Sequence, residues 1–146
     1  MQLDENIRWK FRYEGDFKYK LDEFENLLSD FKKQLNNKDF INTENRERFF
    51  ELFKSLFDGS VRTLKDYLSY EGIFHSEPID IIKEAFYVEI IKDGQVWINM
   101  LFGIKSMFEE TFPEISMTII ECFENSYLPA FKQLDDFFVK EIQACE

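Results

Sequence analysis

Hydrophobic residues recur along this chain at alternating intervals of three and four, which is the period of a helix that buries one face. One such run covers residues 17–35, and a second covers residues 50–68. Residues that favour turns separate the two runs at 36–39, and Gly72 follows the second run. We therefore expect two long bundle helices, the second of which ends near Gly72.

A third helix is expected to begin at Pro78. The N–H groups of a first helical turn have no partner within the helix, so the missing N–H of proline costs no hydrogen bond there. Its expected buried face consists of Ile79, Ile82, Phe86 and Ile90. Asp93 is the expected N-cap of a fourth helix, which carries the apolar segment 96–108. Since this segment is apolar on nearly all sides, we expect it to form both core and a subunit interface.

The last predicted helix opens at Thr111 and Pro113, and Pro129 should kink it midway. Gly59 interrupts the second helix, and the close approach of a neighbouring helix and a tolerated defect both remain open as reasons. The pattern as a whole predicts an all-α fold, an up-and-down bundle of about five helices. The 146 residues are expected to form a single domain, residues 1–146.

The composition supports a packed helical protein, with 45% hydrophobic residues and 18 phenylalanines but only five glycines and three prolines. Most of the aromatic residues fall at core spacing, which favours core packing over base stacking on an exposed surface. The 29 acidic and 18 basic residues give a net charge of −11, which disfavours nucleic-acid binding. The absence of a signal peptide and of a membrane-length apolar run predicts a cytoplasmic protein without a membrane partner.

The chain offers few groups for chemistry. Cys122 and Cys145 are too few for a disulfide framework, and no cysteine or histidine pair stands at metal-ligand spacing. We find no glycine-rich phosphate loop and no nucleophile with a paired base. The sequence therefore predicts no catalytic residue, no metal site and no cofactor.

Four phrases in a fixed order carry a resemblance to a known family: TLKDYL at 63–68, IKEAF at 82–86, DGQVW at 93–97 and YLP at 127–129. From about residue 9 to residue 138, the chain resembles the HEPN superfamily, in its branch of nucleotidyltransferase substrate-binding proteins. The resemblance implies a bundle similar to the C-terminal domain of kanamycin nucleotidyltransferase. It also implies a homodimer that pairs with a small, separate nucleotidyltransferase and helps to bind a nucleotide or small substrate.

Some HEPN proteins are ribonuclease toxins, and the resemblance implies where their motif would lie in this chain. Ile104 occupies the position of the motif arginine, and Lys105 that of the polar residue after it. Glu109 replaces the motif histidine, and Thr111 replaces the tyrosine that receives a nucleotide in silenced toxins. Neither arginine nor histidine occurs between Asp93 and the end of the chain, so no shift of the alignment restores the motif.

The same segment has a packing interpretation. An apolar stripe with spacings of four, three and four, which we expect to form a dimer surface or cleft, consists of Trp97, Leu101, Ile104 and Phe108. An arginine in place of Ile104 would need a partner to be buried there. Lys105 and Glu109 stand four residues apart and can form a surface pair that contributes about 0.3 kcal/mol.

Three functions follow from these observations. The favoured one is a non-catalytic binding subunit that works with a small nucleotidyltransferase. The alternatives are a HEPN-type ribonuclease toxin and a structural or regulatory homodimer without such a partner.

We predict that the purified protein does not cleave RNA, because a general acid–base group and a phosphate-binding cation are both missing from the motif positions. The measurement is incubation with structured RNA after removal of contaminating nucleases. Cleavage that disappears on mutation of a residue in this chain would contradict the prediction.

Overall fold

The computed structural model describes residues 4–109 and 113–144, and every regular element within these ranges is helical. The elements are α1 (Glu5–Arg12), η1 (Tyr13–Lys18), α2 (Tyr19–Asn36), α3 (Thr43–Tyr70), α4 (Pro78–Tyr87), α5 (Gly94–Glu109), α6 (Met117–Cys122), η2 (Phe123–Tyr127) and α7 (Leu128–Ala144). The two η elements are π-helical and join their neighbours without a break, so α1, η1 and α2 form one rod and α6, η2 and α7 form another. The predicted all-α bundle is confirmed.

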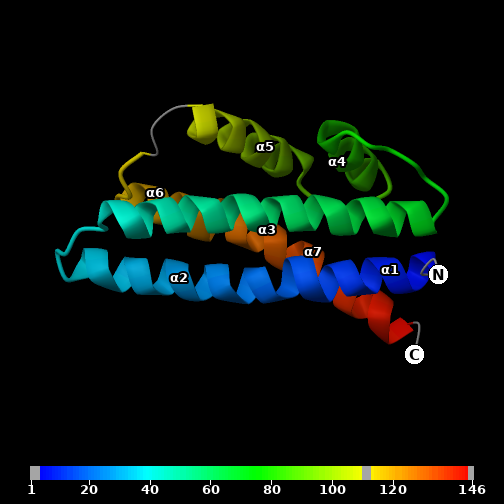
Figure 1. Cartoon of the computed structure of the whole chain (residues 1–146), viewed down its shortest axis with the longest axis horizontal. Helices are drawn as coiled ribbons and strands as arrows, with labels where there is room; N and C mark the ends of the chain where they lie inside the picture. Colours follow the sequence, from blue (N-terminus) through cyan, green and yellow to red (C-terminus); the bar gives the residue numbers. More distant parts are fainter. Residues whose placement is uncertain (1–3, 110–112, 145–146) are drawn as a thin grey trace.

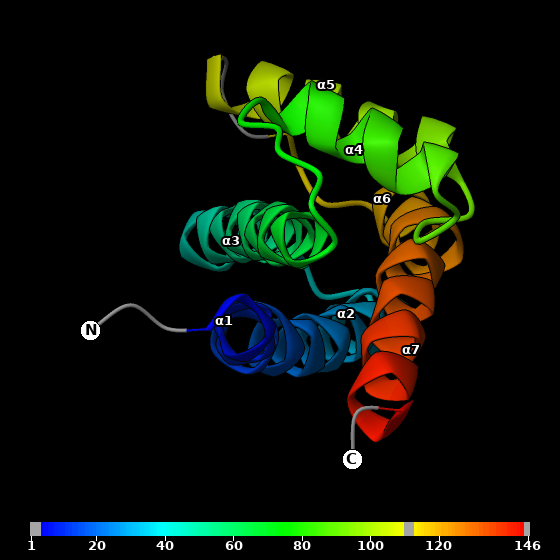
Figure 2. The ribbon, with the colours of Figure 1, turned by 90° about the vertical axis from the view of Figure 1, so that its right-hand side faces the viewer.

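The rods are arranged around α3, which runs antiparallel to the first rod along its whole length (Figure 1). The helices α4 and α5 lie on the opposite side of α3, and the last rod crosses one flank of the bundle (Figure 2). The start of α1 and the end of α7 lie at the same end of the molecule (Figure 1). No helix in the described ranges is long and apolar enough to cross a membrane.

The core is largely aromatic, as the spacing of these residues predicts. Among the phenylalanines whose side chains the structure describes, ten are buried: Phe17, Phe24, Phe31, Phe49, Phe50, Phe53, Phe57, Phe123, Phe131 and Phe138. Many meet edge to face, as Phe53 and Phe123 do at a ring-centroid distance of 4.8 Å. This geometry brings the positive edge of one ring to the negative face of the next, which stabilises the pair beyond the burial of its apolar area.

The first rod begins well before Phe17, where the sequence pattern places its start. The carboxylate of Asp4 accepts a hydrogen bond from the Asn6 N–H at 2.8 Å and so caps α1. Trp9 is fully buried in the core instead of preceding the helix, and its indole N–H donates to the Asn6 side chain at 3.0 Å.

The π-helical segment η1 explains how this early part of the rod keeps one face on the core. The buried residues Trp9, Tyr13, Phe17 and Leu21 follow one another at steps of four. Three such steps in an α-helix would rotate the buried face by about 120°. A π-helical turn takes up one extra residue, or about 100°, and therefore returns the face to the core.

Helix boundaries elsewhere depend on caps. The Asn42 side chain accepts from the Asn45 N–H at 2.8 Å, so α3 begins at Thr43. Its predicted end near Gly72 is confirmed, since Gly72 adopts a φ of 83° and the Ile73 N–H bonds to the Leu68 carbonyl at 2.8 Å.

The last rod starts later than the sequence pattern predicts. The Ser116 hydroxyl accepts from the Ile119 N–H at 3.3 Å and caps α6, which begins at Met117. The expected opening at Pro113 is therefore wrong, and Thr111 lies outside the described residues. The rod continues through Pro129, with the π-helical η2 immediately before it.

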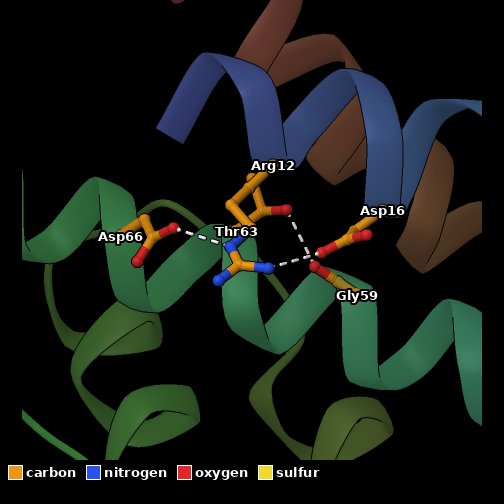
Figure 3. Close-up of polar contacts among 5 residues, drawn as sticks. All are labelled: Arg12, Asp16, Gly59, Thr63 and Asp66. Atoms are coloured by element: carbon orange, nitrogen blue, oxygen red, sulfur yellow. Dashed lines mark hydrogen bonds and ion pairs between the residues drawn. The ribbon is translucent and has the colours of Figure 1, made fainter. Parts of the chain in front are cut away.

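Gly59 is required by the crossing of the first rod and α3. A Cβ at this position would lie 1.9 Å from the carbonyl oxygen of Asp16, so the two backbones approach too closely for any side chain. Around this contact, the Arg12 guanidinium bonds to Asp16 at 3.0 Å and to Asp66 at 3.1 Å (Figure 3). The buried Thr63 hydroxyl donates to the Gly59 carbonyl at 2.8 Å. Of the two reasons left open for Gly59, the structure favours close packing.

We predict that Gly59→Ala lowers the free energy of unfolding by about 2–4 kcal/mol, because the added methyl group must push the two backbones apart. The measurement is urea-induced unfolding. Gly15→Ala is the matched control, since a Cβ at Gly15 meets nothing within 4 Å. It should change the stability by no more than about 1 kcal/mol. Equal effects of the two variants would contradict the role assigned to the contact.

Candidate functional site

The helix α5 carries the residues that the sequence analysis singled out. Trp97 is 0% exposed, Leu101 8% and Ile104 6%, and all three belong to the core of a single chain. Trp97 packs against Phe57 and Phe131 at ring-centroid distances of 6.0 and 5.3 Å. These three side chains are therefore not surface groups that a second copy could contact.

The other predicted positions on this segment are less buried or lie outside the described residues. Lys105 is exposed, and the side chains of Phe108 and Glu109 are not described, nor is Thr111. The solvent side of α5 also carries Gln95 and Asn99, whose side chains bond to each other at 2.8 Å. The outward side of α5 is therefore mixed, because Gln95, Asn99 and Lys105 share it with Phe102, which is 56% exposed. A homodimer stays a prediction.

The turn between α4 and α5 has an unusual backbone. The helix α4 ends at Tyr87 because Glu89 adopts a φ of 65°, a left-handed conformation that residues other than glycine rarely take. The Ile90 N–H then bonds to the Ala85 carbonyl at 2.8 Å and closes the helix end. Contrary to the predicted buried face of this helix, Phe86 is 52% exposed. Tyr87, which was not part of that predicted face, is 82% exposed. Local strain of this kind recurs at functional sites.

Gln133 on α7 holds this turn in place. Its side-chain carbonyl accepts from the Lys92 N–H at 3.1 Å, and its amide donates to the Ile90 carbonyl at 3.0 Å. Asp93 then caps α5 by accepting from the Val96 N–H at 3.2 Å, which confirms the predicted N-cap. One side chain of α7 and one cap thus fix both sides of the turn.

A groove of about 730 Å³ runs between the turn and α7. We call it the turn groove, and its lining consists of Glu89, Lys92, Glu124, Leu128, Pro129, Lys132, Gln133, Asp136, Phe137 and Lys140. A second hollow of about 530 Å³ lies against Phe86 and Tyr87 and shares Glu89 and Lys92 with the turn groove. The turn therefore contributes residues to two concave surfaces.

The turn groove carries both signs of charge. Lys132 is paired with Glu25, and Glu124 with Lys32 at 2.9 Å. Within the described residues, Glu89, Lys92 and Lys140 make no ion pair, so their charges remain available to a bound molecule. Such a surface can bind a partner or ligand that itself carries both signs of charge.

Two buried phenols fix α7, which forms one wall of the groove. The Tyr13 hydroxyl donates to Asp135, and the Tyr67 hydroxyl donates to Glu141 at 3.1 Å. Burial, followed by the hydrogen bond to Asp135, raises the pKa of Tyr13. Burial, followed by the charge of Glu141, raises the pKa of Tyr67. Both phenols stay protonated donors that join the last rod to the first rod and to α3.

No three described His, Cys, Asp or Glu side chains lie close enough together to hold a metal ion. The sequence analysis missed Gln133, Glu89 and Tyr87, whose roles depend on the geometry of the turn. Three of the four phrases nevertheless lie at this site. IKEAF leads into the turn, DGQVW follows it, and YLP supplies Pro129 to the groove. The fourth phrase, TLKDYL, lies at the crossing with the first rod.

In the comparison with protein families, residues 19–140 match the family described as "Nucleotidyltransferase substrate binding protein like". The matched range extends from the start of α2 through most of α7 and includes the whole turn groove. A search of curated proteins finds no match.

We predict that Tyr13 and Tyr67 do not ionise at the ordinary tyrosine pKa of about 10 while the chain is folded. In the unfolded chain both would lose their protons near that pH, whereas the folded state keeps them. Rising pH above about 10 therefore favours the unfolded state, and the contribution of these phenols to stability is fully present only below that pH.

The measurement is a spectrophotometric titration of tyrosinate, compared with unfolding followed at each pH. The double variant Tyr13→Phe with Tyr67→Phe should show a weaker decline of stability in alkali. Ionisation of all six tyrosines near pH 10 in the folded protein would contradict the prediction.

Proposed function

This chain belongs to the nucleotidyltransferase substrate-binding-protein-like family, and we propose that it is a non-catalytic subunit of a small, separate nucleotidyltransferase. In this role it pairs with the enzyme chain and helps to bind its substrate or nucleotide. The observation that carries the proposal is the family match over residues 19–140. The four departures from the toxin motif, at Ile104, Lys105, Glu109 and Thr111, support a role without catalysis in this chain.

The turn between α4 and α5 is the surface that we assign to the nucleotidyltransferase. Phe86 and Tyr87 are exposed aromatic residues, which protein interfaces use as anchors because they bury a large area at low conformational cost. The unpaired charges of Glu89 and Lys92 lie beside them, as polar groups do at an interface rim. Gln133 already holds the turn, so little flexibility is lost when a partner binds.

The net charge of −11 adds a long-range contribution. A nucleotidyltransferase handles phosphates and presents a basic face to them, so the two chains should attract each other before contact. Added salt screens this attraction, since the Debye length falls to about 8 Å at physiological ionic strength.

We predict that the association rate with the purified nucleotidyltransferase falls as salt rises from low to above physiological concentration, while the dissociation rate changes less. Surface plasmon resonance measures both rates. An association rate that does not depend on salt would reject steering by charge, and no binding at any salt concentration would reject this partner.

The same assay locates the surface. Tyr87→Ala should raise the dissociation rate by about tenfold or more, because an aromatic anchor is removed from the interface. Tyr19→Ala is the matched control, since Tyr19 is also an exposed tyrosine but lies at the start of α2, away from the turn. Equal effects of the two variants would place the docking surface elsewhere.

A further inference from the structure

A third concave site lies between α3, the C-terminal half of α5 and the rod formed by α6 and η2. It has a volume of about 280 Å³ and shares none of its lining residues with the turn groove. We call it the ring pocket, because four aromatic residues line it: Phe50, Phe53, Phe123 and Tyr127. This volume is just below the range of roughly 300–1,000 Å³ that is usual for pockets that bind drug-sized ligands. The ring pocket can therefore hold about one ring system.

The aromatic side of the pocket has a fixed geometry. Tyr127 stacks on Phe53 with an interplanar angle of 9° and a centroid distance of 5.5 Å. Phe123 meets Tyr127 edge to face at 5.0 Å and meets Phe53 in the same way at 4.8 Å. Because these rings are held by one another, the pocket wall is already formed before any ligand arrives.

Gly103 keeps the opposite side of the pocket open. A Cβ at this position would meet nothing within 4 Å, in contrast to Gly59, where no side chain fits. Glycine in the interior of a helix is unfavourable, and neither a close contact nor a positive φ requires it in α5. The physical effect of this glycine is therefore the space that it leaves in the pocket.

Polar groups stand among the apolar walls. Tyr127 belongs to the π-helical η2, and π-helical turns often occur at functional sites. Burial raises the pKa of Tyr127, so its hydroxyl remains a hydrogen-bond donor. Ser106 and the free thiol of Cys122 are exposed and mark the mouth of the pocket.

We infer that the ring pocket binds a planar aromatic ring with a hydrogen-bonding edge. The ring of Tyr127, which is partly exposed and stacks on the buried Phe53, can contact such a ring, and the partly buried Met107 can contact it through sulfur. Ser106 and Tyr127 can bond to its polar edge. No charged side chain lines the pocket among the described residues, which argues against the phosphate part of a ligand in this site.

This inference rests on the substrate-binding part of the proposed function. Two parts of a nucleotidyl-transfer reaction share the required chemistry: the base of the nucleotide and an aryl group of the acceptor substrate. The experiment therefore uses adenosine for the first and phenol for the second, with cyclohexanol as a non-planar control of similar size to phenol.

The test measures dissociation constants of the three probes for the full chain by ligand-observed NMR. We expect adenosine, phenol or both to bind at least tenfold more tightly than cyclohexanol. Gly103→Leu should weaken this binding at least tenfold, because the leucine side chain fills the pocket. The matched control is Gly15→Leu, which adds the same side chain at a helical glycine in open space and should leave binding unchanged.

A stability measurement distinguishes loss of ligand binding by Gly103→Leu from loss of folding. Gly103→Leu should not lower the melting temperature, since leucine favours a helix more than glycine does and the site has room for it. A second measurement leaves the pocket unaltered: in a Cys145→Ser background, a saturating probe should slow alkylation of the Cys122 thiol at least fivefold.

Binding of adenosine alone assigns the pocket to the base of a nucleotide, and binding of phenol alone assigns it to an aryl acceptor. Either result supports the inference. It is overturned if neither probe binds, if cyclohexanol binds equally well, or if Gly103→Leu binds as the unaltered chain does. Since the assay uses this chain alone, its failure is distinct from a failure to bind the nucleotidyltransferase.

Discussion

The approach of two backbones at Gly59 is the contact on which the arrangement of the bundle depends. The carbonyl of Asp16 occupies the space of the missing side chain, so the first rod lies directly against α3. This proximity determines how far the side chains of the first rod extend into the core. Tyr13 then reaches Asp135 on α7, and Phe17 reaches Phe131 and Phe138 at centroid distances of 6.5 and 6.1 Å. The last rod, which lines parts of the turn groove and of the ring pocket, is therefore positioned through this contact.

Much of this architecture could be predicted from the sequence, because burial of one helix face leaves a regular pattern. The helical class, the end of α3 near Gly72 and the Asp93 cap all followed from spacing and from residue preference at helix ends. Close packing was one of the two explanations offered for Gly59, since a glycine in a helix interior calls for a reason. These predictions held because each depends on a few neighbouring residues.

The features that escaped prediction depend on tertiary context. A glutamate has no sequence signal for a positive φ, so the end of α4 before Glu89 and the exposure of Phe86 could not be read from spacing alone. The role of Gln133 arises only because α7 passes beside the turn. The π-helical η1 did leave a trace, namely the steps of four from Trp9 to Leu21, which an α-helix could not keep on one side.

The last rod takes part in both the turn groove and the ring pocket. Pro129 has no N–H, so it cannot donate to a carbonyl of the preceding turn, and an ordinary α-helical turn there would lack one bond. Immediately before Pro129 the chain forms η2, in which the Leu128 N–H bonds to the Phe123 carbonyl five residues back. This wider turn places Tyr127 in the wall of the ring pocket and Pro129 in the turn groove. Because two positions so close in sequence serve different sites, the local geometry of η2 determines where the two sites lie relative to each other.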